Sequence, residues 1–328
     1  MGIFLVGTPL SPSYQLAFVL ALIAGMGNSA MDASSYPALT EMFPKSAGSA
    51  NVLVKAFISA GASLLPIMIL FFSNNDMYFG YAFFVPAVIF FLNMIFLFTV
   101  SFPDHRNVKR SVDRSDVLIP TFQTKPVFGK EGLALVVIGF TSTGLFTVSQ
   151  IWMPTFGQEV VGMTVANSLK LLSYYSVGAL ISVLVLSVLL KKFLKPVTVM
   201  VIYPMITFVS ILIILTVKIP LITDITAFFI GFSTAGVFQL AITVMSELFW
   251  KRKGTVTGIL ATASGLAAII MPFVTGKMAE SGAIAIIFIF DAALSAVGFI
   301  AACYVYYRYN KIFKVKVNGE QEYLPKAK

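Results

Sequence analysis

The sequence is short of charged residues and of the residues that form cross-links or metal sites. Charged residues make up 11% of its 328 positions, against roughly 25% in a soluble domain. A single cysteine, Cys303, and a single histidine, His105, exclude an intramolecular disulfide, a CxxC redox pair and a Cys/His zinc cluster. So few charges do not cover the surface of a soluble protein of this length. Lipid is therefore expected to be the main solvent of the chain.

The common nucleotide-binding and zinc-enzyme motifs are also absent. The sequence has no GxxxxGK[ST] loop and no HExxH segment, which argues against ATP-driven transport and zinc proteolysis. Gly25 and Gly27 belong to a partial dinucleotide fingerprint, but it lies in an apolar run with no strand before it. The net charge of +9 comes from basic residues between apolar runs, so it does not indicate a nucleic-acid partner. We predict that the chain is not an enzyme and uses no cofactor or metal.

Long apolar runs dominate what is present. Hydrophobic residues make up 58% of the chain, and the mean hydropathy is +0.91. Runs of about 20 such residues, each long enough as a helix to cross the roughly 30 Å hydrocarbon core, recur along the sequence. We predict an all-α membrane protein with about nine transmembrane helices, at residues 14–41, 49–73, 78–102, 132–156, 168–190, 197–217, 219–248, 256–276 and 283–307.

The basic residues predict the orientation of these helices. Cytoplasmic loops of membrane proteins retain Lys and Arg, and alternate gaps hold 19 of the 23 basic residues of this chain. The loop after residue 102 and the C-terminus belong to this basic set. We therefore predict a multi-pass protein of the cell membrane with a cytoplasmic C-terminus.

An internal repeat divides the chain. A shift of 206 positions pairs identical residues in two helix pairs of the same orientation, namely Gly25 with Gly231, Glu41 with Glu247, Phe43 with Phe249, Lys45 with Lys251, Gly48 with Gly254 and Pro66 with Pro272. Parallel repeats joined by a long basic loop resemble the major facilitator superfamily of transporters, whose two six-helix halves are arranged in this way.

This resemblance implies a division of the chain and a missing segment. Residues 1–102 would form the N-terminal half, 103–130 a cytoplasmic linker, 131–307 the six-helix C-terminal half and 308–328 a cytoplasmic tail. By the same pairing, the first residues of the chain correspond to the second half of the ninth helix of the family. The expected fold is therefore a major facilitator fold that lacks helices 1, 2 and half of helix 3.

Ionisable side chains inside the predicted spans are costly, at about 2.5–3.5 kcal/mol each, and usually face a cavity or a partner. Asp32 shares a polar stripe with Asn28 and Tyr36, and Lys55 shares one with Asn51 on the next helix. Both ionisable residues lie at a comparable distance from the turn between the helices, so we expect an ion pair between them. A proton arriving at Asp32 would break this pair and bias the cavity toward its other facing. The alternative is a pair that only neutralises two buried charges.

The stretch 27–62 also resembles the fucose and proton symporter branch of the superfamily. There an acidic residue precedes a proline on the fourth helix, a Pro-x-Ser-x-Gly turn follows, and the fifth helix continues with Asn, a polar residue and Phe before Gly. The same places here hold Asp32, Pro37, Pro44-Lys45-Ser46-Ala47-Gly48, Asn51, Lys55, Phe57 and Gly61. The resemblance implies that Asp32 handles the proton. Lys55 replaces an amide of that branch, and a cation there suits an anionic solute such as a sugar acid.

Further polar residues are candidates for the solute site. The side chains that offer the hydrogen bonds and aromatic faces that polyols engage are Asn28, Tyr36, Asn51, Gln150, Tyr174, Tyr175 and Gln239. For Tyr174 and Tyr175 a place at the membrane interface is the alternative. Asp291, in the last span, is expected to have a structural or oligomeric role.

A gate is expected at the cytoplasmic ends of the repeated helices. Glu41 and Glu247 end these two helices, beside Lys45 and Lys251 respectively. Ion pairs formed there would close the cytoplasmic side. Solvated loop charges are the alternative.

These observations favour a secondary active transporter, driven by a proton gradient, that moves a small polar solute by alternating access. A sugar or a sugar acid is the favoured solute. The alternatives are a proton-driven exporter of drugs or metabolites, supported by the 31 phenylalanines, and a non-transporting membrane sensor, scaffold or inactive fragment. The expected partners are the solute and the lipid bilayer, with no nucleic acid and no obligate protein partner for the full-length form.

Overall fold

The computed structural model describes residues 1–43, 46–100, 124–280, 282 and 284–313. Lys45, His105, most of the predicted linker and most of the predicted tail lie outside these residues. Within the described part every regular element is a helix. The first helices are α1 (Gly2–Gly7), α2 (Tyr14–Met42), α3 (Ala47–Asn74) and α4 (Tyr81–Thr99). The later ones are the π-helical turn η1 (Phe128–Gly132), α6 (Leu133–Glu159), α7 (Val165–Lys192), α8 (Pro196–Thr216), α9 (Pro220–Thr234), α10 (Val237–Leu248), the 3-10 turn η2 (Trp250–Arg252), α11 (Lys253–Glu280) and α12 (Ile284–Ile312).

These helices correspond to the predicted spans. By length and composition, eight helical segments of the described residues are able to cross a membrane, and α3 contributes the shorter apolar stretch Ala47–Ile58. Local signals in the sequence explain several of the helix starts. Pro196 and Pro220 occupy the first turns of α8 and α9, where proline lacks only a hydrogen bond that a helix start does not make. The prediction of an all-α membrane protein is confirmed.

The chain divides into two compact units. The first contains Met1–Asp32 and Gly61–Thr121, and the second contains Ala33–Ala60 and Phe122–Lys328. In the first unit α1 packs on α4, and the hydroxyl of Tyr78 donates a hydrogen bond to the carbonyl of Pro9. The predicted boundary between two halves falls largely within residues 101–123, so it stays a prediction.

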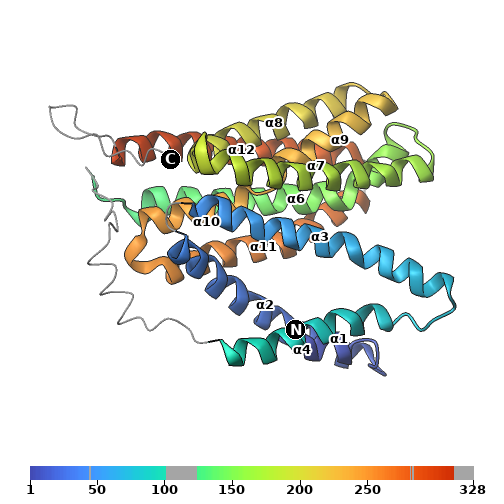
Figure 1. Cartoon of the computed structure of the whole chain (residues 1–328). Coiled ribbons are helices and arrows are strands. Elements are labelled where there is room, and N and C mark those ends of the chain that lie inside the picture. Colours follow the sequence, from blue (N-terminus) through green and yellow to red (C-terminus); the bar gives the residue numbers. More distant parts are fainter. Residues whose placement is uncertain (44–45, 101–123, 281, 283, 314–328) are drawn as a thin grey trace. The chain divides into compact units, whose positions relative to one another are not determined.

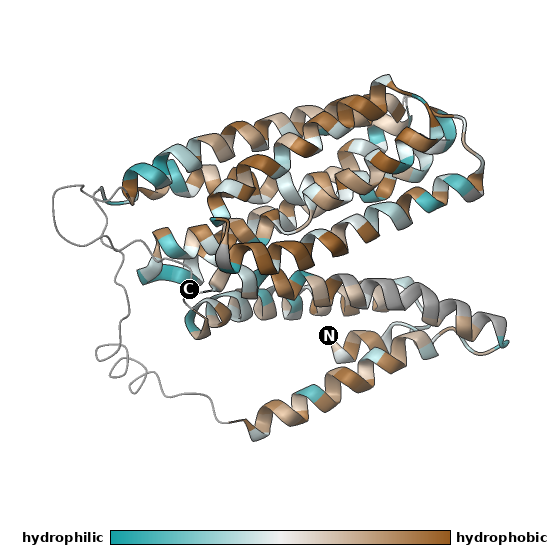
Figure 2. Cartoon of the chain, turned by 45° about the horizontal axis from the view of Figure 1, so that its top comes forward, coloured by the Kyte–Doolittle hydropathy of each residue, from teal (hydrophilic) through white to brown (hydrophobic). Residues whose placement is uncertain are grey.

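In the second unit α6 to α12 form a bundle (Figure 1). Figure 2 shows apolar residues along most of these helices and polar residues gathered mainly near the helix ends, as expected of helices that face lipid. Two clusters of buried apolar side chains fill the bundle: one includes Leu135, Val183 and Leu240, and the other includes Val148, Ile230 and Phe288. Helix α6 packs against α11 and α12, and α7 packs against α9.

Two glycines bring α7 and α9 into unusually close contact. A Cβ atom added to Gly178 would lie 2.1 Å from the carbonyl oxygen of Phe228, and one added to Gly231 would lie 2.0 Å from that of Tyr175. Because any side chain at these positions would collide with backbone, the close approach requires glycine. Small residues at helix contacts are a general means of packing in membranes, since apolar side chains there gain little by leaving lipid.

The predicted span 219–248 is broken in its middle. Helix α9 ends at Thr234, Ala235 is extended, and Gly236 has a left-handed backbone with φ of 85° before α10 begins. Glycine adopts this conformation without the steric penalty that other residues meet. The break separates a half-helix that packs on α7 from the short half-helix α10.

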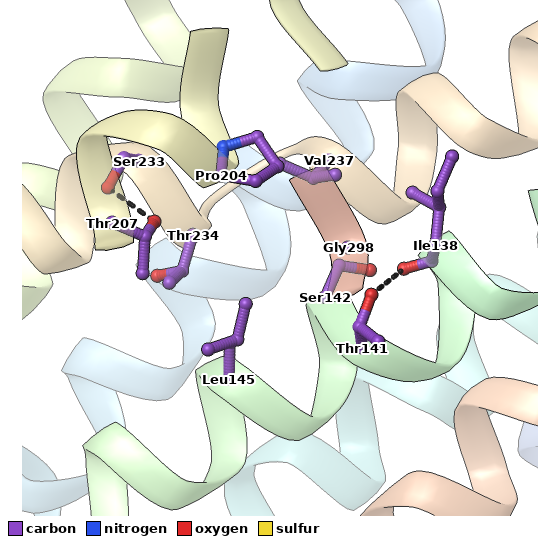
Figure 3. Close-up of a pocket in the computed structure, with 10 residues that line it drawn as sticks. All are labelled: Ile138, Thr141, Ser142, Leu145, Pro204, Thr207, Ser233, Thr234, Val237 and Gly298. Carbon is purple, nitrogen blue, oxygen red and sulfur yellow. Dashed lines mark hydrogen bonds between the residues drawn. The ribbon is translucent and has the colours of Figure 1, made fainter. Parts of the chain in front are cut away.

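A small cavity lies beside this break, between α6, α8, α9 and α12 (Figure 3). Its volume is ≈ 10 Å³, room for about one water molecule. Hydroxyl groups line it, and those of Thr207 and Ser233 are hydrogen-bonded to each other at 2.7 Å. The cavity is too small for a solute of the expected kind.

Candidate functional site

A buried polar layer joins α2 and α3 to α10 within the second unit. The amide nitrogen of Gln239 lies 3.4 Å from the hydroxyl of Tyr36. The amide nitrogen of Asn51 donates to the hydroxyls of Thr243, at 3.0 Å, and Thr40, at 3.3 Å. Three residues predicted from the sequence therefore lie in one layer, and all three are almost fully buried.

The ammonium of Lys55 lies one helical turn further along α3. Its nitrogen is 4.0 Å from the centroid of the Phe146 ring on α6, an arrangement in which the face of an aromatic ring attracts a cation. Gln150 lies four residues after Phe146, on the same face of α6, and its side chain is exposed. Lys55 thus contacts Phe146, and Gln150 lies one turn further along α6.

Tyr175 on α7 is hydrogen-bonded to the backbone of Phe146. Its hydroxyl donates to the carbonyl of Phe146, at 3.3 Å, and is 3.0 Å from the hydroxyl of Thr234 at the end of α9. The side chain is 1% exposed, whereas that of Tyr174 is 41% exposed. Adjacent residues of a helix point in different directions. The two predicted tyrosines therefore have different surroundings, and Tyr175 lies in the interior.

Asp32 and Asn28 lie in the first unit. The amide nitrogen of Asn28 is 3.4 Å from a carboxylate oxygen of Asp32 one turn away. Because Asp32 and Lys55 belong to different units, the ion pair between them stays a prediction.

The predicted gate residues have identifiable partners. A carboxylate oxygen of Glu41, at the end of α2, is 3.9 Å from the ammonium of Lys253 at the start of α11. Glu247, at the end of α10, accepts a hydrogen bond from the hydroxyl of Tyr309 at 3.0 Å. Lys251, predicted beside Glu247, lies over the ring of Trp250 instead, at 5.4 Å. The Glu41 pair connects α2 to α11, while the Glu247 bond fixes the end of α12.

Sequence reasoning missed a second ion pair at the same ends of the helices. Glu131 in η1 is completely buried, and one of its oxygens lies 2.5 Å from the guanidinium of Arg308 on α12. Its other oxygen accepts a hydrogen bond from the backbone of Val127 at 2.9 Å. The sequence shows only that Glu131 directly precedes one apolar run and that Arg308 directly follows the last one. Nothing in the sequence pairs two residues so far apart.

The donor set of the described residues does not suit a metal ion, because no group of three or more His, Cys, Asp or Glu side chains gathers there. The polar groups of the layer are amides and hydroxyls, and one ammonium, that of Lys55, lies a helical turn away. Such groups orient a small polar molecule through hydrogen bonds and attract a negative charge.

Comparison with known proteins places these features in a family. The sequence profile of the Major Facilitator Superfamily matches residues 1–249. An uncharacterised transporter of this type from Bacillus subtilis strain 168, YfkL, is 57% identical over 95% of this chain and 78% of its own length. The inner membrane transport protein YdiN of Escherichia coli K12 is 35% identical over 98% of this chain and 76% of its own.

Solved structures agree on the fold. The crystal structure of the superfamily transporter FucP in the outward conformation has a TM-score of 0.70, with 17% identity over 92% of this chain and 79% of that one. A crystal structure of a point variant of the Escherichia coli fucose:proton symporter FucP has a TM-score of 0.71, with 15% identity over 92% and 81%. At such identities the likeness concerns the fold. The profile match and the two curated relatives establish that this multi-pass membrane protein belongs to the Major Facilitator Superfamily of transporters.

Proposed function

We propose that the protein is a proton-coupled secondary transporter of a small polar solute, with a sugar acid as the favoured class and a neutral sugar as the next. The observation that carries this proposal is the position of Lys55, a cation that faces the ring of Phe146 rather than any described carboxylate of the second unit. Such an ammonium is available to the negative charge of a solute.

The binding argument begins with the cost of the buried charge. A cation–π contact contributes about 0.5–2 kcal/mol, which offsets only part of the cost of holding an ammonium away from water. A carboxylate of the solute would interact with it more strongly, because opposite charges attract more in a medium of low dielectric constant. The amide of Gln150, on the neighbouring turn of α6, would form hydrogen bonds with the hydroxyl groups of the solute.

Proton coupling is assigned to Asp32. In the proposed cycle this carboxylate pairs with Lys55 in one state, and protonation of Asp32 releases the ammonium for the solute. A ligand shifts a conformational equilibrium only through different affinities for the two states. The proton and the solute would meet this condition together, because protonation of Asp32 removes the carboxylate charge that competes with the solute for the Lys55 ammonium. No cofactor is needed in this scheme, because the proton gradient supplies the free energy.

The cytoplasmic gate is assigned to the contacts that join α2 and α3 to α10 and α11. These are the Tyr36 bond to Gln239, the Asn51 bond to Thr243 and the Glu41 pair with Lys253. Opening toward the predicted cytoplasmic side would break all three. In this scheme Tyr36, Asn51 and Gln239 contact the solute only as the gate opens.

The resemblance to FucP supports the sugar assignment, because a fucose:proton symporter shares the fold. The proposal also includes placement in the cell membrane with a cytoplasmic C-terminus, as the distribution of Lys and Arg favours.

The test is accumulation of solute in proteoliposomes under an imposed proton gradient, acidic outside. Radiolabelled sugar acids are compared with the corresponding neutral sugars. The proposal expects accumulation of the acid above the outside concentration and its loss when a protonophore is added. Accumulation that survives the protonophore would exclude proton coupling. Proton-driven movement of apolar drugs without sugar transport would favour an exporter, and the absence of any transport would favour a sensor or scaffold.

A further inference from the structure

Asp291 is a completely buried carboxyl group that the proposed transport cycle does not use. It lies on α12 and is 0% exposed. The neighbouring residues Phe288 and Ala292 belong to the buried apolar cluster that also contains Val148 and Met271. The surroundings of the carboxyl group are therefore largely hydrocarbon.

The hydrogen bonding of Asp291 is incomplete. One carboxyl oxygen is 2.9 Å from the hydroxyl of Ser149 on α6. The other oxygen is buried and has no hydrogen-bond partner among the described residues. Ser295, one turn further along α12, donates instead to the carbonyl of Pro204. The hydroxyl of Ser149 is thus the one hydrogen-bond partner of this carboxyl group among the described residues.

No basic side chain of the described residues forms an ion pair with Asp291. Helix α12 packs against α6, α8 and α11. Tyr175 of α7 interacts electrostatically with Asp291 but carries no positive charge, and its hydroxyl is bonded to that of Thr234. Among the basic groups, Arg308 pairs with Glu131, Lys253 pairs with Glu41, and Lys277 lies over the ring of Phe273. The charge of an ionised Asp291 would therefore lack a compensating partner.

A bare carboxylate in such surroundings is strongly unfavourable, and two occupants relieve it: a metal cation or a proton. Hard cations require about six oxygen ligands, whereas the carboxyl group and Ser149 supply three oxygen atoms. A proton requires no further ligand. The hydroxyl of Ser149 is both donor and acceptor, so it bonds equally well to a carboxylate and to a carboxylic acid.

We propose that Asp291 is a proton-binding site of the C-terminal helices, occupied at neutral pH, and separate from Asp32. The proton resides on the oxygen that faces Ser149, and the second oxygen becomes a neutral carbonyl. An unpartnered neutral carbonyl is far less costly in hydrocarbon than an unpartnered carboxylate oxygen. This inference does not depend on the solute or on the coupling role of Asp32.

Glu131 provides a matched control within the same chain. Both carboxyl groups are 0% exposed, but Glu131 has a guanidinium at 2.5 Å and a backbone donor at 2.9 Å. Glu131 therefore has a charged partner, which Asp291 lacks among the described residues. The two groups therefore differ in partners and not in burial.

Infrared difference spectroscopy of the purified chain in liposomes at pH 7 tests the assignment. Subtraction of the Asp291→Asn spectrum from the wild-type spectrum is expected to reveal the carbonyl band of a protonated carboxylic acid. Subtraction of the Glu131→Gln spectrum is expected to reveal carboxylate bands. Carboxylate bands in the Asp291→Asn difference would overturn the proposal.

A second variant keeps the carboxyl group in place if Asp291→Asn does not fold. Ser149→Ala removes the single hydrogen-bond partner, so the acid carbonyl band is expected to shift in the difference from wild type. A shift confined to carboxylate bands would overturn the proposal. Either result is obtained without a transport assay, so a failure here is distinct from a failure of the proposed function.

Discussion

The ammonium of Lys55 lies 4.0 Å from the centre of the Phe146 ring. This contact joins a helix of the repeated pair to the first helix after the linker. It also gives a cation inside the membrane a partner that carries no charge. The ring attracts the ammonium but leaves it able to bind an anion.

Phe146→Leu is expected to destabilise the protein by about 0.5–2 kcal/mol beyond the effect of lost packing, because the cation–π contact disappears. Phe146→Tyr retains the aromatic face and should retain most of the stability. Thermal melting of both variants in detergent provides the comparison. Equal melting temperatures for the two variants would show that the ring face does not stabilise Lys55.

Lys55→Gln is expected to weaken binding of an anionic sugar at least tenfold, or about 1.4 kcal/mol, while binding of the neutral sugar changes little. The reason is that the amide keeps hydrogen-bonding capacity but removes the charge. Lys55→Arg is the matched control that keeps the charge. Calorimetric titration with a sugar acid and its neutral sugar measures both effects. An equal loss for the two ligands would remove the electrostatic role of Lys55.

Gly178→Ala is expected to cost about 1–3 kcal/mol, as overpacking does. The added Cβ would lie 2.1 Å from the carbonyl oxygen of Phe228, so α7 and α9 must separate. Gly258→Ala is the control, because no heavy atom lies within 4 Å of a Cβ added there. Melting temperatures should fall for the first variant only. Because alanine favours the helix more than glycine does, a similar fall for both variants would contradict the role of the close contact.

The two ion pairs at the helix ends should differ in their effect on stability. Glu41 and Lys253 are 3.9 Å apart, and the Glu41 side chain is 52% exposed, so Glu41→Gln is expected to cost at most about 1 kcal/mol. Glu131→Gln removes a buried partner of Arg308 and should lower the melting temperature considerably more. Thermal melting of the two variants measures the difference, and an equal effect would contradict the larger contribution expected of the buried pair.

The sequence predicted the helices well because their signal is local. A run of about 20 apolar residues marks a span wherever it occurs, and proline at the starts of α8 and α9 marks their first turns. Polar residues within such runs are equally visible. For this reason Tyr36, Asn51 and Gln239, which share one buried layer, were identified from the sequence.

Other features depend on contacts that no local pattern records. Phe146 is one of 31 phenylalanines, and only the position of Lys55 distinguishes it. The break between α9 and α10 depends on the left-handed backbone of Gly236, whereas most glycines of these spans remain within helices. The Glu131 pair with Arg308 joins residues that lie 177 positions apart in the sequence. The proposal for Asp291 likewise depends on Ser149, its one hydrogen-bond partner among the described residues.

Proton movement driven by the solute tests the central claim most directly. Proteoliposomes in weakly buffered medium receive a sugar acid at equal inside and outside pH, and the external pH is recorded. The account predicts alkalinisation outside as protons enter with the solute, its loss in Asp32→Asn, and its retention in the loop variant Asp76→Asn. Solute uptake without a pH change, or an unchanged signal in Asp32→Asn, would contradict proton coupling through Asp32.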